Sequence, residues 1–234
     1  MRAKKNELDT MKTRTVPKVL CELISSLNPT QIDVVVEMGF GTLLNWDIKE
    51  LPPHLSYWVI DNFHPNSCSI RISKEKEIHI REIDVYYYTG LPKGNTQIEC
   101  KKRHLSDPWV KAFMQQFDIV DEETNEMKKL EPKNVTPKML ANKILECDVR
   151  DVWFKRNFVI LFSNQVVECC TSGGINLTLL DILEDTSVIK HLDWCTYMRK
   201  ILIEASDFWL NKKRSEKASK TVFKGPIMLP MVST

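Results

Sequence analysis

The amino-acid sequence predicts a mainly α-helical globular domain that carries one small β-hairpin. Residues 28–44 carry complete helix start and stop signals, and residues 193–211 form a long amphipathic stripe. Glycine is scarce, with 7 among 234 residues, which argues against β-sandwiches and glycine-rich nucleotide folds. Apolar and polar residues alternate at 69–80, where we expect two short strands joined by a turn.

The helix expected within residues 28–44 has both a start and a stop signal. Asn28 is suited to cap it, Pro29 fits the first helical position, and Gln31 completes a capping box. Gly39 ends the helix, because glycine adopts a left-handed turn without strain. The predicted buried face comprises Ile32, Val35 and Val36.

The turn after this helix contains Gly39, Phe40 and Gly41. Dinucleotide-binding loops also place two glycines around one residue, but a third glycine is missing here and the pair follows a helix. We therefore interpret both glycines as requirements of backbone geometry and Phe40 as a core residue.

The rest of the N-terminal half follows from local signals. Residues 1–16 are basic and polar, which predicts a disordered tail, and Pro17 opens the first helix. A third helix starts near residue 51 and ends at a His64-Pro65-Asn66 turn, and a fourth ends at Gly90 before a connector at 95–106. The apolar stripe of the third helix comprises Leu55, Trp58, Val59 and Phe63.

Further helices and a linker are expected in the C-terminal half. Asp107-Pro108 and Thr136-Pro137 both have the cap-plus-proline start of a helix. Residues 120–134 are highly charged and predict a mobile linker between two lobes, whereas the apolar run at 158–162 predicts a central buried helix. We expect Trp58, Trp153, Trp194, Trp209 and Phe208 on buried stripes. The predicted units are a tail (1–16), an N-terminal lobe with the hairpin (17–119), the linker (120–134), a C-terminal lobe (135–228) and a tail (229–234).

Composition limits the function classes. The net charge of +2 gives no strong overall attraction to nucleic acid or membranes. Seven cysteines, an odd number, and a polar N-terminus without an apolar signal segment favour a reduced intracellular protein. The apolar run at 158–162 is far too short to span a bilayer.

Short motifs occur along the N-terminal half: Leu27-Asn28 with Gln31, Met38-Gly39-Phe40-Gly41 with Leu43-Leu44, Trp58 with Phe63 and Pro65, the hairpin before Asp84-Val85, and Gly90-Leu91-Pro92 with Gly94. Looser motifs follow at Phe158-Val159, Asp193-Trp194-Cys195 and Phe223-Lys224-Gly225-Pro226. Taken in order, these motifs resemble the plant mobile domain family, often labelled aminotransferase-like, over roughly residues 17–228. Two departures are Tyr86-Tyr87-Tyr88, where the family has aliphatic residues, and Asn95, where it has a glycine.

The resemblance implies a non-catalytic, transposon-derived helical domain in the nucleus, linked to transposon silencing or genome maintenance. The family is also found upstream of Ulp1-type cysteine proteases, so a non-catalytic N-terminal part of such a gene product is another interpretation. It implies no catalytic residues, metal or cofactor, and it favours protein partners.

The sequence contains few residue patterns that are typical of an enzyme active site. His191, Asp193 and Cys195 are close in sequence, but their spacing suits one helical turn instead of a protease triad. The same His191 and Cys195, at i and i+4, could share a zinc ion, although buried structural thiols are commoner. A pyridoxal phosphate enzyme needs a glycine-rich phosphate cup, which we do not find. We therefore expect no enzymatic activity.

A nucleic-acid-binding module is the main alternative. Short basic runs can contact phosphates or serve as nuclear import signals, and they can also be solvated helix ends. The candidate residues are Lys101, Lys102, Arg103, Lys212, Lys213 and Arg214.

Overall fold

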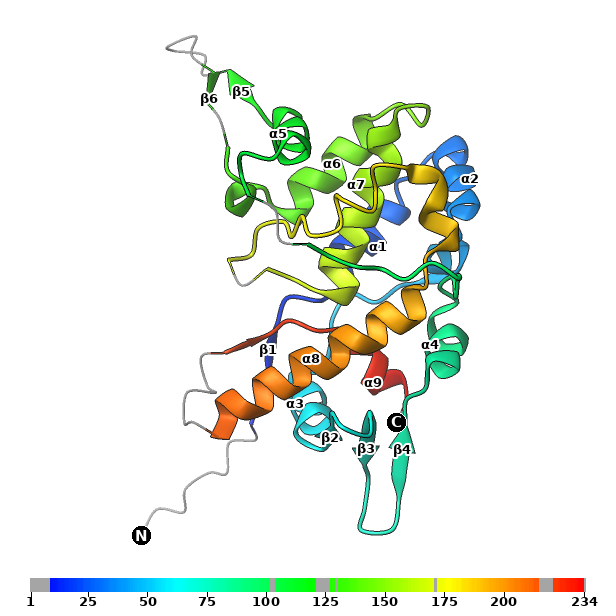
Figure 1. The fold of residues 1–234 in the computed structure, drawn as a ribbon, viewed down its shortest axis with the longest axis vertical. Helices are drawn as coiled ribbons and strands as arrows, with labels where there is room; N and C mark the ends of the chain where they lie inside the picture. Colours follow the sequence, from blue (N-terminus) through cyan, green and yellow to red (C-terminus); the bar gives the residue numbers. More distant parts are fainter. Residues whose placement is uncertain are drawn as a thin grey trace.

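A computed structural model describes residues 9–101, 104–120, 127–128, 130–170, 172–214 and 221–233 of the chain. These residues fold mainly into α-helices with short strands at the periphery (Figure 1), which confirms the predicted fold class. The α-helices are α1 (Lys18–Ile24), α2 (Pro29–Glu37), α3 (Pro53–Asp61), α4 (Glu82–Thr89), α5 (Pro108–Gln115), α6 (Pro137–Glu146), α7 (Val152–Phe162), α8 (Trp194–Arg214) and α9 (Met228–Val232). The short 3₁₀ helices are η1 (Gly41–Asn45), η2 (Pro132–Asn134) and η4 (Thr186–His191). A π-helix, η3 (Ser163–Val167), follows α7 directly.

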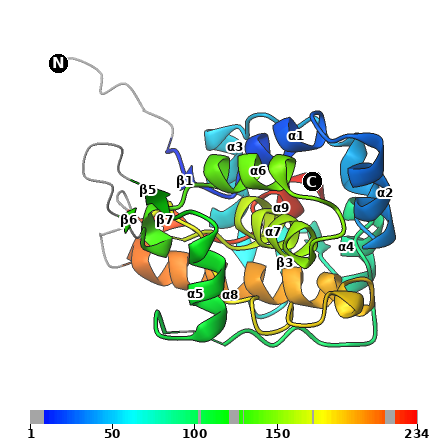
Figure 2. The ribbon, with the colours of Figure 1, turned by 90° about the horizontal axis from the view of Figure 1, so that it is seen from above.

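Helix α7 forms the centre of the molecule. Figure 2 shows it between α6 on one side and α8 on the other. Phe158, Phe162 and the residues between them have no exposed surface, as the apolar run predicted. The Phe162 ring lies 5.6 Å from the Trp194 ring of α8 and 4.9 Å from the Phe40 ring, so one aromatic cluster joins distant parts of the chain.

Helix α5 is attached to α7 through a buried arginine. The Arg156 guanidinium lies 4.5 Å from the centre of the Trp109 ring and 5.0 Å from that of Trp153. It also donates hydrogen bonds to the carbonyls of Leu183 (2.9 Å) and Glu184 (2.8 Å). Burial lowers the pKa of Arg156. These bonds and the two aromatic faces compensate for the buried charge.

The expected hairpin is present and has a third strand. The strands are β1 (Lys12–Thr13), β2 (Phe63–His64), β3 (Ser69–Arg71), β4 (Glu77–His79), β5 (Ile119–Val120), β6 (Met127–Lys128) and β7 (Val222–Phe223). Antiparallel β3 and β4 pair Ile70 with Ile78, and β2 pairs Phe63 with Ile70 on the other side. His64, expected in a turn, therefore belongs to a strand, and β2 extends the hairpin to a three-stranded sheet.

Both predicted tails are wrong in their described parts. In the first tail, Met11 is buried and β1 pairs in parallel with β7. In the second, α9 lies within residues 229–234 for most of its length, and Leu229 has no exposed surface. The polar composition of residues 1–16 gave no sign of the pairing between β1 and β7, because backbone hydrogen bonds between strands do not depend on side-chain type. Residues 1–8 and 234 lie outside the described residues.

The charged segment 120–134 is partly ordered. Residues 121–126 and 129 lie outside the described part of the chain, but β5 and β6 pair with each other. The carbonyl of Pro132 in η2 accepts a hydrogen bond from the backbone of Ile175 (3.2 Å). Buried residues from both expected lobes belong to one continuous hydrophobic core.

Four apolar residues expected to be buried are largely exposed: Val36 (52%), Leu55 (40%), Trp58 (39%) and Phe208 (48%). In each case a neighbour in the helix holds the buried position. Val35, Ser56, Val59 and Trp209 are the buried neighbours, and adjacent residues along a helix point about 100° apart. No helix within the described residues is long and apolar enough to cross a membrane.

Candidate functional site

The two glycine-containing motifs, some 50 residues apart in sequence, meet in space. Gly39 has φ +87°, and a Cβ on it would lie 2.6 Å from Cγ of Pro92. Gly90 has φ +64° and ends α4 against the side chain of Thr42, whose hydroxyl donates to the carbonyl of Thr89 (3.0 Å). Both glycines are therefore needed for the left-handed backbone and for close approach.

A third motif joins the same contact. The backbone N–H of Trp194 donates to the carbonyl of Pro92 (3.1 Å), and the indole packs against Phe40 with ring centres 5.4 Å apart. Leu91 has no exposed surface. We call this set, Gly39, Phe40, Gly90, Leu91, Pro92 and Trp194, the motif junction.

Two other predicted motif residues have local roles. Asn28 and Gln31 form the expected capping box, with bonds of 3.0 and 3.1 Å. Gly41 is not needed for backbone geometry, contrary to our expectation. Its φ is not in the left-handed region, and an added Cβ would make ordinary contacts, the nearest at 3.4 Å from Val36.

Cys195 is a structural thiol in this environment. Its sulfur lies 3.5 Å from the carbonyl oxygen of Leu91, and burial, with the nearby Asp193 carboxylate, raises its pKa to about 12. An activated thiolate needs a lowered pKa. His191 ends η4 and is exposed, so it does not share a helix with Cys195 as expected. Within the described residues, no three His, Cys, Asp or Glu side chains are grouped to hold a metal ion.

The structure does not bring the basic runs together. Lys101 is exposed, whereas Lys102 and Arg103 lie outside the described residues. The Cys100 thiol contacts the Tyr197 hydroxyl (3.3 Å), so the chain just before the first run lies beside the early part of α8. Lys212 is 15 residues further along that helix, or about 22 Å at 1.5 Å per residue.

The second run is partly engaged in packing. Lys213 forms an ion pair with Asp61 and lies 4.8 Å from the centre of the Tyr57 ring. Lys212 lies 5.7 Å from the centre of the Phe208 ring. Arg214 is in the last turn of α8, and its side chain lies outside the described part of the structure.

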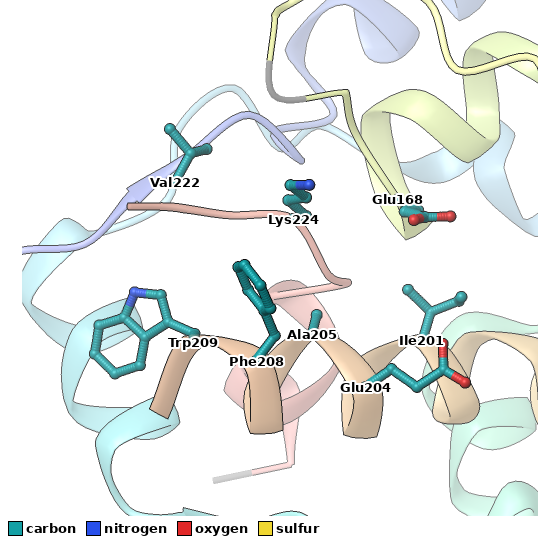
Figure 3. Close-up of a pocket in the computed structure, with 8 residues that line it drawn as sticks. All are labelled: Glu168, Ile201, Glu204, Ala205, Phe208, Trp209, Val222 and Lys224. Carbon is teal, nitrogen blue, oxygen red and sulfur yellow. The ribbon is translucent and has the colours of Figure 1, made fainter. Parts of the chain in front are cut away.

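A hollow of about 180 Å³ lies between α8 and β7. Figure 3 shows the side chains that line it. Phe208 and Lys224 lie together, with the ammonium 5.8 Å from the ring centre, while Glu168 and Glu204 line another part of it. Because both charge signs line this hollow, its electrostatics favour neither an anion nor a cation.

The most exposed aromatic group lies on α4. Tyr86, Tyr87 and Tyr88 are 43%, 73% and 43% exposed, and the rings of Tyr86 and Tyr87 meet edge to face with centres 5.6 Å apart. We call these three residues the tyrosine face. Contiguous exposed aromatic residues are a feature of interaction surfaces, whereas single exposed apolar residues are ordinary.

Helix α4 is held firmly beneath the tyrosine face. Val85 and Thr89 are buried, and the Arg199 guanidinium of α8 donates to the carbonyl of Ile80 just before the helix (2.8 Å). Asp84 accepts a hydrogen bond from the backbone N–H of Arg81 (2.8 Å) and two from its guanidinium. These bonds lower the pKa of Asp84 and satisfy the start of the helix.

The exposure of the three tyrosines was not predicted from the sequence, in which Tyr86 and Tyr87 indicate a short helix and all three depart from a family pattern. A usable signal was present, because three consecutive residues on a helix span about 200° and cannot all face one core. With Val85 and Thr89 four residues apart on the buried side, the tyrosines between them must point outward.

Searches for similar sequences among curated proteins and for similar folds among solved structures gave no match. A family model described as a domain of unknown function (DUF8566) matches residues 13–231, and the chain therefore belongs to this family.

Proposed function

We propose that this chain is a non-catalytic, transposon-derived interaction domain related to the plant mobile domain family, and that it binds a nuclear protein partner through the tyrosine face. The observation that carries the proposal is the set of three consecutive exposed tyrosines on a well-anchored helix. The motif resemblance supports the family relationship, and the buried, high-pKa thiol of Cys195 supports a role without cysteine chemistry.

Tyrosines suit protein recognition for a physical reason. Each ring offers a large apolar area and a hydroxyl that can donate or accept a hydrogen bond, and ordering its few rotatable bonds loses little entropy. Tyr87 is the most exposed of the three, so a partner would bury most of its ring. Because α4 is fixed at both ends, binding would require little rearrangement of the backbone.

The charge around the tyrosine face favours a protein partner over nucleic acid. Helix α4 contains Glu82 and Asp84 and no lysine or arginine. Nucleic-acid affinity depends mainly on several lysine or arginine contacts to phosphates. The nearest arginine, Arg81, is already engaged with Asp84.

The partner proposal can be tested with a surface variant and a matched control. The variant replaces Tyr86, Tyr87 and Tyr88 with glutamine, and the control is Phe208→Gln, which removes a half-exposed aromatic residue from α8. Proteins retained from nuclear extract by each immobilised chain are compared by quantitative mass spectrometry. We expect a set of proteins that wild type and the control retain equally and the triple variant loses at least tenfold.

Equal retention by all three chains would reject the tyrosine face as the binding surface. Substrate turnover by the purified chain, abolished by a single substitution, would reject the non-catalytic role. The circular dichroism spectrum and melting temperature of the triple variant should match those of wild type, which checks that a loss of binding does not come from unfolding.

The nuclear location is a separate part of the proposal. It can be tested by imaging a fluorescent fusion with Lys101, Lys102 and Arg103 replaced by glutamine, beside one with Lys212, Lys213 and Arg214 replaced. Because Lys213 is already paired with Asp61, we expect the first set to reduce nuclear accumulation more. Uniform distribution of the wild-type fusion between nucleus and cytoplasm would contradict the proposed location.

A further inference from the structure

Two neighbouring buried amides in the π-helix η3 differ in their partners. Asn164 donates to the carbonyls of Ile160 (2.9 Å) and Asn176 (3.1 Å) and accepts from the backbone N–H of Asn176 (2.8 Å). Gln165 is only 5% exposed, yet its side-chain amide makes no hydrogen bond with any described residue. Packing alone gives no reason for a glutamine at this position.

The Gln165 side chain lines a surface hollow of about 340 Å³. The hollow lies where the segment after β1, the start of α6 and η3 come together, and its apolar walls include Val16, Val19 and Pro137. Mostly apolar walls with a few convergent polar groups are the usual composition of a small-molecule site. A π-helical turn is also frequent at functional sites.

The charged side chains that line this hollow, among the described residues, are basic. Arg14 and Lys18 line it, and no aspartate or glutamate of the described residues does. Arg14 is held at the rim, where its guanidinium packs 3.4 Å from the position a Cβ would take on Gly173 and donates to the carbonyl of Cys170 (3.4 Å). Pro137 is the first residue of α6, so the positive end of that helix dipole also lies here.

We propose that this hollow binds a small organic carboxylate with an apolar body. Arg14 and Lys18 supply the attraction for the carboxylate, and the valines and Pro137 contact the apolar body. Gln165 supplies hydrogen bonds that it does not make with the described residues. This binding site is independent of the tyrosine face and of any partner bound there.

The experiment uses the full chain, kept reduced, and three probes: benzoate, its neutral counterpart benzamide, and inorganic phosphate. Binding is measured by titration calorimetry and by the shift in melting temperature at pH 7. We expect benzoate to bind with a millimolar or lower Kd, and benzamide and phosphate to bind at least tenfold more weakly. Gln165→Met and Arg14→Gln should each weaken benzoate binding at least fivefold, whereas Lys111→Gln, which changes a lysine of α5 that does not line the hollow, should leave it unchanged.

A second measurement keeps the proposal testable if a variant is unstable. Because Gln165 has no internal hydrogen bond to lose, Gln165→Met should melt no lower than wild type when no probe is present. A clearly lower melting temperature would assign Gln165 a structural role and overturn the proposal. Equal binding of benzoate and benzamide, equal binding of benzoate and phosphate, or unchanged benzoate binding in Gln165→Met would overturn it as well.

Discussion

The tyrosine face and part of the motif junction, Gly90 to Pro92, are neighbours in sequence. The junction residues pack against one another, whereas the tyrosines are exposed. At the junction, Leu91 and Phe40 have no exposed surface, and Gly39 and Gly90 adopt positive φ so that two loops can touch. On α4, three large rings remain outside. The residues that carry the motif resemblance are thus used for packing, whereas the three that depart from the motif pattern lie exposed at the surface.

This contrast predicts the largest loss of stability at Phe40. Its ring contacts the rings of Phe158, Phe162 and Trp194, with centres 6.0, 4.9 and 5.4 Å away. Phe40→Ala should lower the free energy of unfolding by about 3–5 kcal/mol, because it removes buried area and leaves a cavity. Urea denaturation measures it, with Phe208→Ala as the half-exposed comparison. A loss at Phe40 no greater than that at Phe208 would contradict the central place of the junction.

The two glycines beside Phe40 should differ from each other. Gly39→Val forces a β-branched residue to φ +87° and places its Cβ against Pro92, so we expect a loss of about 2–4 kcal/mol. Gly41→Ala meets only ordinary contacts and should change stability by less than about 1 kcal/mol in either direction. Chemical denaturation of the pair measures this directly, and similar losses at both positions would show that φ is not the deciding property.

The cap of α4 connects the two regions and should have a smaller, pH-dependent effect. Asp84→Asn removes the charge that accepts three hydrogen bonds from Arg81 and should lower stability by about 1 kcal/mol at pH 7. The folded pKa of Asp84 is lowered, so its stabilising contribution is complete above the unfolded pKa of about 4.

That contribution disappears as the pH falls through the folded pKa of Asp84. The stability difference between wild type and Asp84→Asn should therefore shrink during acid titration below about pH 4. Thermal unfolding at several pH values measures this difference. A difference that stays constant from pH 7 to pH 2 would rule out the carboxylate charge as the cause.

Local signals in the sequence were sufficient for elements whose hydrogen bonds are local. The Asn28 and Gln31 capping box, the caps at Asp107 and Thr136, and the left-handed Gly39 were all predicted correctly. Elements that depend on distant partners were missed. Strand β1 pairs with β7 some 210 residues away, and β2 needs β3, so neither has a local pattern.

The candidate sites were harder to predict for a related reason. Composition identified the basic runs but could not show that Lys213 pairs with Asp61 from another helix. Gln165 carries no sequence signal, because its lack of partners follows from the positions of α6, η3 and the N-terminal segment together. Buried-face errors such as Val36 arose because apolar content alone does not decide which of two adjacent residues faces the core.

The smallest effect on stability is expected at the tyrosine face itself. Tyr87 is 73% exposed, so Tyr87→Ser removes little buried area, and the helix propensities of the two residues are similar. Its free energy of unfolding should change by less than about 0.5 kcal/mol in denaturant titration, while binding of a partner captured by wild type weakens. A side chain whose removal leaves the free energy of unfolding unchanged can be used for binding without cost to the fold. If Tyr87→Ser destabilises the chain as much as Asp84→Asn does, the ring serves the fold, and the contrast between the two regions fails.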